Sequence, residues 1–276
     1  MPIAHVNAVD LYYEATGQGT PLVWSHEFGG DHRSWEPQVR FFSRRYRVIT
    51  YNHRGYAPSS VPKAARDFSQ DLLVEDLHQL LNHLGLGPVH LGGCSMGANV
   101  ARDHALAHPE TLRSLVMVGA GAGSVDRQQF LDGQQATAAA LDREGTAARV
   151  RNLETAPTRA AFRRKDPRGF AEFLRQASEH DPHACAHLAR EVMSKRKTVP
   201  ELEADLKALR VPTLVMVGDQ DTPCVEPSLL MRRLIPHAGL CVFPACGHTP
   251  NIEEPGLFNL HVAEFLAAVD AGRWMS

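Results

Sequence analysis

The sequence predicts an α/β protein in which a mainly parallel, doubly wound sheet carries an inserted helical cap. Over the first 120 residues, short apolar segments alternate with segments of helical periodicity, a pattern typical of βαβ crossovers. Apolar, strand-like segments return near the C-terminus. Between the two regions β-branched runs vanish while helical spacing persists, which indicates a helical insertion.

These boundaries predict a core built from 1–122 and 210–276, with the cap formed by 123–209. An insertion that follows the C-terminal end of a strand lies over the crevice where open α/β sheets bind ligands. We therefore expect the cap to cover a functional site, in a small and largely apolar pocket.

Each strand of the predicted parallel sheet is short, apolar and bounded by Gly, Pro or charge. These strands are 21–26, 46–52, 88–93, 112–120, 211–217 and 239–245. The N-terminal segment predicts a separate antiparallel pair that turns at Asn7-Ala8. Helices are expected at 71–84, from Met96 to before Pro109, and at about 255–268.

Composition excludes several classes of protein. The chain has 276 residues, 43% of them hydrophobic and 22% charged, with a net charge of −2, so neither nucleic acid nor an anionic membrane is an expected partner. No apolar run approaches the length of a membrane span, and the N-terminus does not resemble a secretory signal. The 5 cysteines show neither zinc spacing nor a disulfide framework, which predicts a cytoplasmic protein without a metal.

The segment Gly93-Cys94-Ser95-Met96-Gly97 lies between an apolar strand and a helix. In that context Gly-x-Ser-x-Gly predicts a nucleophile elbow, a sharp turn that exposes the serine hydroxyl above the sheet. Its glycines allow the strand and the helix to approach closely. Ser95 is therefore the candidate nucleophile, and the alternative is a serine that merely fills a tight turn.

A serine hydroxyl needs a base to take its proton, and in the order serine, acid, histidine that base comes late in the chain. His248 follows the strand 239–245 and precedes the last helix, so it is the candidate base. Asp219 and Asp221 follow the strand after the insertion. One of them should orient His248, and the other should cap the loop through backbone N–H groups.

The motifs LVWSHEFGGDHRSW, VITYNHRGYAPSS, GGCSMGA, VGDQD and GHTPNIEEP resemble the α/β-hydrolase fold superfamily in its own order, specifically its esterases, lactonases and haloperoxidase-like members with a helical cap. The layout is similar to that of 3-oxoadipate enol-lactonases. The resemblance implies that Asp221, at the last position of Gly-x-x-Asp, is the triad acid. It also implies that Glu254 is the structural glutamate beside the final helix.

The resemblance places the oxyanion hole at the backbone N–H groups of Phe28 and Met96, with His26 as a structural residue. Glu27 departs from the glycine usual at its position. A carboxylate there would oppose the oxyanion, so we expect Glu27 to point toward solvent or toward Arg54. The alternative is that Glu27 contacts substrate or acts as a second acid or base.

Two further residues bear on the site. Asn52 stands where the family commonly has Asp, which changes local charge more than reaction type. The Cys94 thiol should point into packing and take no part in catalysis.

Together these features predict a serine hydrolase that cleaves a small carboxylic ester or lactone through an acyl-enzyme, without a cofactor. The same triad supports hydrolysis of carbon–carbon bonds in vinylogous ketones, peracid formation, and cofactor-free lyase or oxygenase chemistry. A ligand-binding sensor that retains a hydrolase scaffold is the alternative from another class. The partner expected is a small-molecule substrate, and a homo-oligomer remains open.

Overall fold

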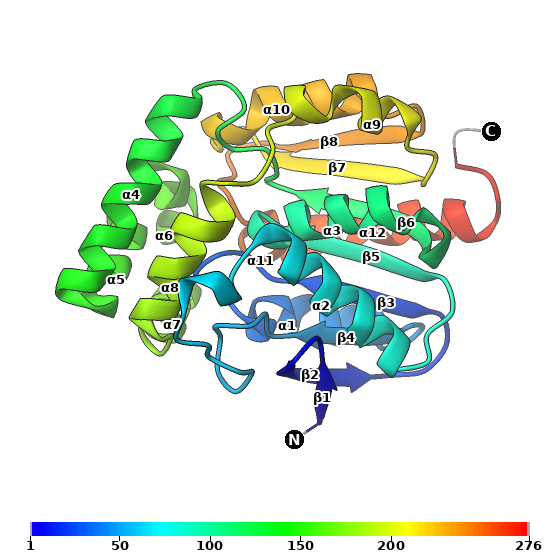
Figure 1. Ribbon diagram of the computed structural model, residues 1–276. Helices are drawn as coiled ribbons and strands as arrows, with labels where there is room; N and C mark the ends of the chain where they lie inside the picture. The colour runs from blue at the N-terminus through cyan, green and yellow to red at the C-terminus, as the bar shows by residue number, and fades with distance from the viewer. Residues whose placement is uncertain (1, 275–276) are drawn as a thin grey trace.

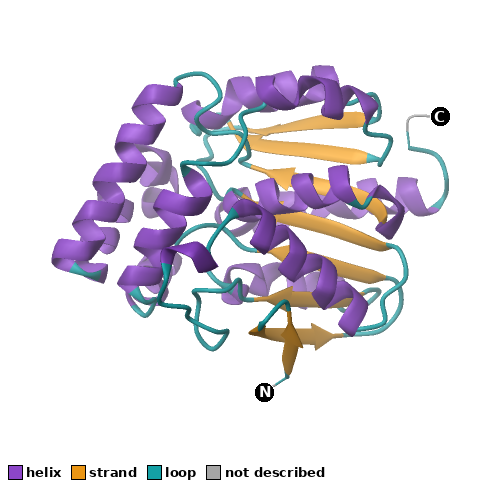
Figure 2. Cartoon of the chain, viewed as in Figure 1, coloured by secondary structure: helices purple, strands orange, loops and turns teal. Residues whose placement is uncertain are grey.

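A computed structural model describes residues 2–274, which form an eight-stranded sheet flanked by helices (Figures 1 and 2). The strand order is β1-β2-β4-β3-β5-β6-β7-β8, and β2 pairs antiparallel with both of its neighbours. The remaining pairs are parallel. The predicted fold class is therefore confirmed. The strands are β1 (Ile3–Val6), β2 (Val9–Thr16), β3 (Pro21–Ser25), β4 (Arg47–Tyr51), β5 (Val89–Cys94), β6 (Leu112–Val118), β7 (Thr213–Gly218) and β8 (Ala238–Phe243).

Helices cover both faces of the sheet. In Figure 1, α2 (Gln70–His83) and α3 (Met96–Ala107) lie in front of it, and α1 (Glu36–Phe42) and α12 (Pro255–Asp270) lie behind. The short elements between them are η1 (His32–Trp35), η2 (Ala65–Asp67), η3 (Pro109–Thr111) and α11 (Pro250–Glu253), and α10 (Thr222–Leu234) follows β7.

Alternation along the strands divides the core into two layers, because successive side chains of a strand point to opposite faces. Val23 and Leu91 join the layer under α2 and α3, whereas Leu22 and Trp24 join the layer under α1 and α12. Trp24 stacks on Trp35 with ring centroids 4.4 Å apart. The N-terminal turn also matches expectation, since Asn7 and Ala8 have φ of 46° and 61°.

The segment between β6 and β7 forms helices, and most of them gather beyond the C-terminal ends of the parallel strands (Figure 1). A small cluster of buried Leu and Phe side chains holds this cap together. Its helices are α4 (Arg127–Glu144), α5 (Thr146–Thr155), η4 (Pro157–Arg159), α6 (Ala160–Lys165), α7 (Pro167–Ser178), α8 (Pro182–His187) and η5 (Leu188–Met193, a π-helix).

After the cap the chain returns to the core through η6 (Pro200–Leu202) and α9 (Glu203–Ala208). Helix α9 falls inside the range predicted for the insertion, 123–209, although it packs against α10 beside the sheet. In the described part of the chain, no helix combines the length and hydropathy that a bilayer span requires.

Candidate active site

Ser95 lies at the turn between β5 and α3 in a strained backbone conformation, with φ 52° and ψ −110°. The flanking glycines are required by close approach. A Cβ on Gly93 would lie 2.4 Å from the Gly97 carbonyl, and one on Gly97 would lie 2.1 Å from the Ser25 carbonyl oxygen. This is the geometry that the Gly-x-Ser-x-Gly pattern predicts.

The elbow is fastened to β6. The Ser95 N–H donates to the Val118 carbonyl at 2.8 Å, and the Asn99 side-chain amide donates to the Ser95 carbonyl at 2.7 Å. The neighbouring Cys94 side chain is fully buried, and burial raises the pKa of its thiol well above its ordinary value. A buried neutral thiol is inert, so the packing role expected for Cys94 fits its surroundings.

His248 and Asp221 form a close pair, with 2.7 Å between His248 Nδ1 and Asp221 Oδ2. Because a carboxylate only accepts hydrogen bonds, the proton lies on Nδ1 and leaves Nε2 free to act as a base. A Cβ on Gly119 would lie 3.2 Å from both Asp221 Oδ2 and His248 Nδ1. Gly119 directly follows Val118, whose carbonyl accepts a hydrogen bond from the Ser95 N–H. The three candidate residues therefore converge at the C-terminal end of β6.

The second aspartate has the capping role. Asp219 Oδ1 accepts a hydrogen bond of 3.1 Å from the Cys246 N–H and thereby ties the β7 loop to the loop that carries His248. It makes no hydrogen bond to His248 in the described part of the chain. The distinction between the two aspartates thus follows the Gly-x-x-Asp spacing.

The structural glutamate is Glu253, and the assignment to Glu254 was wrong. Glu253 is buried and accepts hydrogen bonds from the N–H groups of Gly247 (2.7 Å) and Thr249 (2.9 Å), on either side of His248. Glu254 instead pairs with Lys165 at the surface. The difference arises because Glu253 ends the short helix α11, which turns its side chain back toward the histidine loop.

The expected oxyanion donors lie on adjacent elements. Phe28 follows β3, and Met96 is the first residue of α3, where an N–H has no acceptor within the helix. Strands β3 and β5 are neighbours, and the Cβ of a residue at 97 would lie 2.6 Å from the His26 carbonyl. The loop after β3 and the elbow therefore emerge side by side.

His26 joins this loop to the loop after β4. Its Nδ1 donates to the Glu27 carbonyl at 2.9 Å, and its Nε2 accepts from the His53 N–H at 3.1 Å. Burial lowers the pKa of His26 to about 4, so it is neutral at ordinary pH. These contacts are those of the structural histidine that the family resemblance implies.

Glu27 does not point toward solvent, contrary to prediction, because it is fully buried. Its Oε1 accepts a hydrogen bond from the Ser34 hydroxyl at 3.0 Å, whereas Oε2 has no hydrogen-bond partner among the described residues. Arg54 is not its partner, since that guanidinium forms a buried ion pair with Asp76 at 2.6 Å. Burial raises the pKa of Glu27, and the positive charge of Arg159 offsets only part of this effect.

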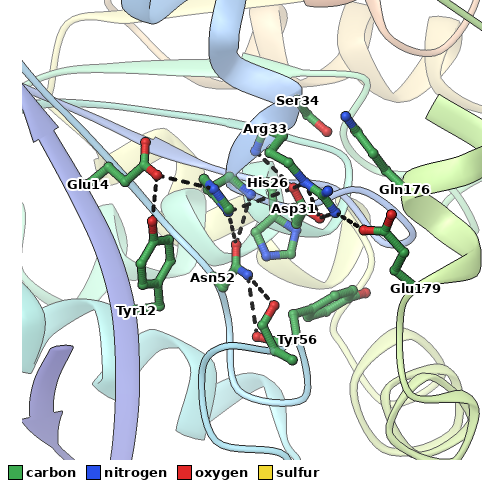
Figure 3. Close-up of polar contacts among 12 residues, drawn as sticks. Tyr12, Glu14, His26, Asp31, Arg33, Ser34, Asn52, Tyr56, Gln176 and Glu179 are labelled. Atoms are coloured by element: carbon green, nitrogen blue, oxygen red, sulfur yellow. Dashed lines mark hydrogen bonds and ion pairs between the residues drawn. The ribbon is translucent and has the colours of Figure 1, made fainter. Parts of the chain in front are cut away.

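The rest of this loop is anchored to the cap and to the floor of the site (Figure 3). Arg33 Nη2 donates to Asp31 at 2.6 Å and forms an ion pair with Glu179, just after α7, at 2.8 Å. Burial alone would raise the pKa of Asp31, but hydrogen bonds from His180 and Arg33 hold it well below its usual range. Asn52 Oδ1 accepts from the N–H after Asp31 at 2.9 Å, so it braces the same loop.

A groove of about 430 Å³ opens between this loop and the cap. Ser34, which bonds to Glu27, lies on its wall together with Phe173 of α7 and Ile252 of α11. The groove therefore extends from the surface to Ser34, the hydrogen-bond partner of the buried Glu27 carboxyl.

One group of side chains has the composition of a metal site. Potential ligand atoms of Asp221, Cys224 and His248 lie within 4.8 Å of one another. The Cys224 thiol donates to the Gly119 carbonyl at 3.2 Å, and burial, followed by the charge of Asp221, raises its pKa well above its ordinary value. Metal binding needs a thiolate, so these contacts fit a hydrogen-bonded acid and base better than a metal centre.

Two cap arginines near the site carry no motif and were not predicted. Arg149 of α5 donates from Nη2 to the Phe28 carbonyl at 2.8 Å, and Arg159 of η4 donates from Nη1 to the Thr249 hydroxyl at 2.6 Å. Arg149 thus contacts an expected oxyanion donor residue, Phe28, and Arg159 contacts the residue that follows the candidate base. The surroundings of the elbow are therefore more polar than the apolar pocket that we expected.

Comparison with known proteins places these features in context. The profile of the family described as alpha/beta hydrolase fold matches residues 20–255. The chain is 28% identical to a putative carbamate hydrolase RutD of Azorhizobium caulinodans, over 98% of this chain and 100% of that protein. It is 26% identical to 3-oxoadipate enol-lactonase 2 of Acinetobacter baylyi, over 96% and 97%. A thermophilic esterase of Thermogutta terrifontis, solved with malate bound, superposes with a TM-score of 0.84 at 29% identity, over 95% and 94%.

Proposed function

Since the chain belongs to the alpha/beta hydrolase fold family, we propose that it is a serine hydrolase that cleaves a small carboxylic ester or lactone. The observation that carries the proposal is the 2.7 Å pair of His248 Nδ1 and Asp221 Oδ2, next to a serine held at φ 52°. The likeness to an enol-lactonase and to an esterase, over nearly the whole chain, supports the same reaction class.

In the proposed reaction, His248 Nε2 takes the proton of the Ser95 hydroxyl as its oxygen attacks the substrate carbonyl carbon. Asp221 stabilises the imidazolium that forms. The N–H groups of Met96 and Phe28 donate to the carbonyl oxygen as it becomes negative. The imidazolium then protonates the departing alkoxide, which leaves an acyl group on Ser95. Water, deprotonated by His248, hydrolyses that acyl group and restores the serine.

A carbamate is the second candidate substrate, favoured by the likeness to a putative carbamate hydrolase over 98% of this chain. Its carbonyl carbon would meet the same serine, base and oxyanion donors. The two candidates differ in the acyl group left on Ser95, a carboxylic acyl group in one case and a carbamoyl group in the other. Carbamoyl groups are the less electrophilic, so a slow second step would favour the carbamate.

The proposal is tested by removing the nucleophile. Ser95→Ala should lower kcat on a panel of p-nitrophenyl esters, lactones and carbamates by on the order of a millionfold, with the fold intact. A fluorophosphonate should label the native protein at Ser95, and His248→Ala should suppress labelling. His5→Ala, which changes an exposed histidine of β1, is the matched control. Turnover or labelling that survives in Ser95→Ala would refute the proposal.

A further inference from the structure

The Arg149 guanidinium lies against the loop expected to bind the oxyanion. Besides the 2.8 Å hydrogen bond to the Phe28 carbonyl, its Cζ lies 4.4 Å from the centroid of the Phe28 ring. A Cβ on Gly29 would lie 2.5 Å from Arg149 Nη2, so the guanidinium packs directly against this glycine. The charge of a cap residue thus lies against the residue whose N–H is an expected oxyanion donor.

Among residues 2–274 no carboxylate forms an ion pair with Arg149, and its buried Nε has no hydrogen-bond acceptor. The side chain lies deep in the protein and still keeps some accessible surface. Burial lowers the pKa of Arg149 to about 10, which leaves it charged at neutral pH.

Arg159 adds a second positive charge to the same region. It is 4% exposed, contacts Thr249 directly after His248, and lies over the Phe173 ring at 5.0 Å. It also forms no ion pair in the described part of the chain. An acid lies close to it, since Glu253 accepts from the same Thr249 hydroxyl at 3.1 Å. Arg159 therefore places positive charge beside the histidine loop, whereas Arg149 is the guanidinium that contacts no carboxylate in the described part of the chain.

Removing a cation from water without a counter-ion is unfavourable, and an anionic ligand would offset that cost. The planar guanidinium matches the geometry of a carboxylate, and such charge-assisted hydrogen bonds are among the stronger ones in proteins. We infer that the substrate carries a carboxylate and that Arg149 binds it, with Arg159 adding positive charge. This inference rests on the proposed function and narrows its substrate class to carboxylate-bearing esters or lactones.

Two substrates that differ only in charge test this inference, monomethyl glutarate and its neutral analogue methyl glutaramate. The native protein should prefer the carboxylate in kcat/KM. Arg149→Gln should reduce that preference by about ten- to a hundredfold, the range expected for a lost charge-assisted hydrogen bond. Arg149→Lys should restore part of it. Arg151→Gln, an exposed arginine on the same helix that pairs with Glu144, is the matched control and should leave the preference unchanged.

Binding of glutarate separates this inference from the proposed function. Calorimetric titration of the native protein should show saturable binding that Arg149→Gln weakens and Arg151→Gln preserves. Ser95-dependent hydrolysis without charge preference and without glutarate binding would overturn the inference and leave the hydrolase proposal standing. Glutarate binding through Arg149 in a protein that cleaves no ester would refute the hydrolase proposal and leave the carboxylate site standing. Equal losses on both substrates in Arg149→Gln would also overturn the inference, since a merely structural arginine has that effect.

Discussion

Replacing Glu27 by Gln probes the departure of this chain from the glycine usual in its family. The amide oxygen of Gln can still accept the Ser34 hydroxyl, which in the native protein lies 3.0 Å from Glu27 Oε1, so the loop should be retained. The substitution removes the ionisable carboxyl group. Burial raises the pKa of Glu27 above its ordinary value of 4.5, because the charged form is poorly solvated and Oε2 has no partner among the described residues.

The effect on stability has a definite sign. Below pH 4.5 both the folded and the unfolded protein carry the proton, and the group adds no pH dependence. Above it the unfolded state loses the proton first, so the free energy of unfolding falls until the pH passes the folded-state pKa. Glu27→Gln has no proton to lose at this position, so its free energy of unfolding does not fall for this reason. The difference in free energy of unfolding between Glu27→Gln and the native protein should therefore grow with rising pH, by about 1.4 kcal/mol for each unit by which burial raises the pKa.

Urea unfolding of both proteins between pH 4.5 and 8.5 measures the difference and cancels the other titrating groups. Glu36→Gln, at an exposed carboxylate of α1, is the control and should show no such trend. On an ester, kcat of Glu27→Gln should equal or exceed that of the native protein, most clearly at high pH where a carboxylate would oppose the oxyanion. A pH-independent stability difference would refute the argument from burial. A loss in kcat beyond about a hundredfold would show that Glu27 is an acid or base.

The remaining predictions concern the residues that support His248. Asp221→Asn should lower kcat about ten-thousandfold by removing the charge that orients the imidazole, while Asp219→Asn, which weakens the hydrogen bond from the Cys246 N–H by removing the charge of its acceptor, should mainly lower the melting temperature. Steady-state kinetics and thermal unfolding of the two variants check this, and the opposite ranking would mean that the acid was misassigned. Glu253→Gln should lower both stability and kcat, by about 1.5–3 kcal/mol in stability for a charged hydrogen bond lost between the loop and α11. Glu254→Gln should change stability by less than about 1 kcal/mol because its ion pair with Lys165 is partly exposed, and equal effects of the two would contradict the assignment of Glu253.

The fold and the positions of Ser95, Asp221 and His248 could be read from the sequence because each depends on local pattern. Apolar runs predicted the strands, and the glycines around Ser95 predicted a turn at which β5 and α3 approach closely. In a parallel sheet, the loops that follow β5, β7 and β8 emerge at one edge. Knowing which strand each residue follows is therefore enough to bring the three together.

The errors lie where a residue's environment is set by distant parts of the chain. The outward orientation of Glu27 was predicted because an ionised carboxylate would oppose the oxyanion, an argument that leaves out a buried carboxyl with a raised pKa. The missing side chain of Gly30 makes room for Glu27 inside the protein. A Cβ there would lie 2.2 Å from Glu27 Oε1. Arg54 instead pairs with Asp76 of α2. These two residues are 22 positions apart, and no local sequence pattern indicates that they meet.

The choice between Glu253 and Glu254 failed for a different reason. Both lie between Pro250 and Pro255, which start two successive helices, and only the orientation of the short helix α11 decides which side chain faces His248. Arg149 lies on α5 two residues before the exposed Arg151, and Arg159 ends the short element η4. Their burial follows from how α5 and η4 settle over the elbow, which periodicity within those helices does not encode.

Glu27 and the arginines are best understood as one electrostatic arrangement. If Glu27 were ionised, it would be the natural counter-ion for Arg159, yet no ion pair forms between them among the described residues. Burial shifts Glu27 toward the neutral form, which adds no negative charge beside the expected oxyanion donor at Phe28. In that form Glu27 neither creates the conflict that a carboxylate at this position would cause nor competes with an anionic substrate for the arginines. Under the proposed function, the pH that ionises Glu27 should therefore weaken both oxyanion stabilisation and carboxylate binding together.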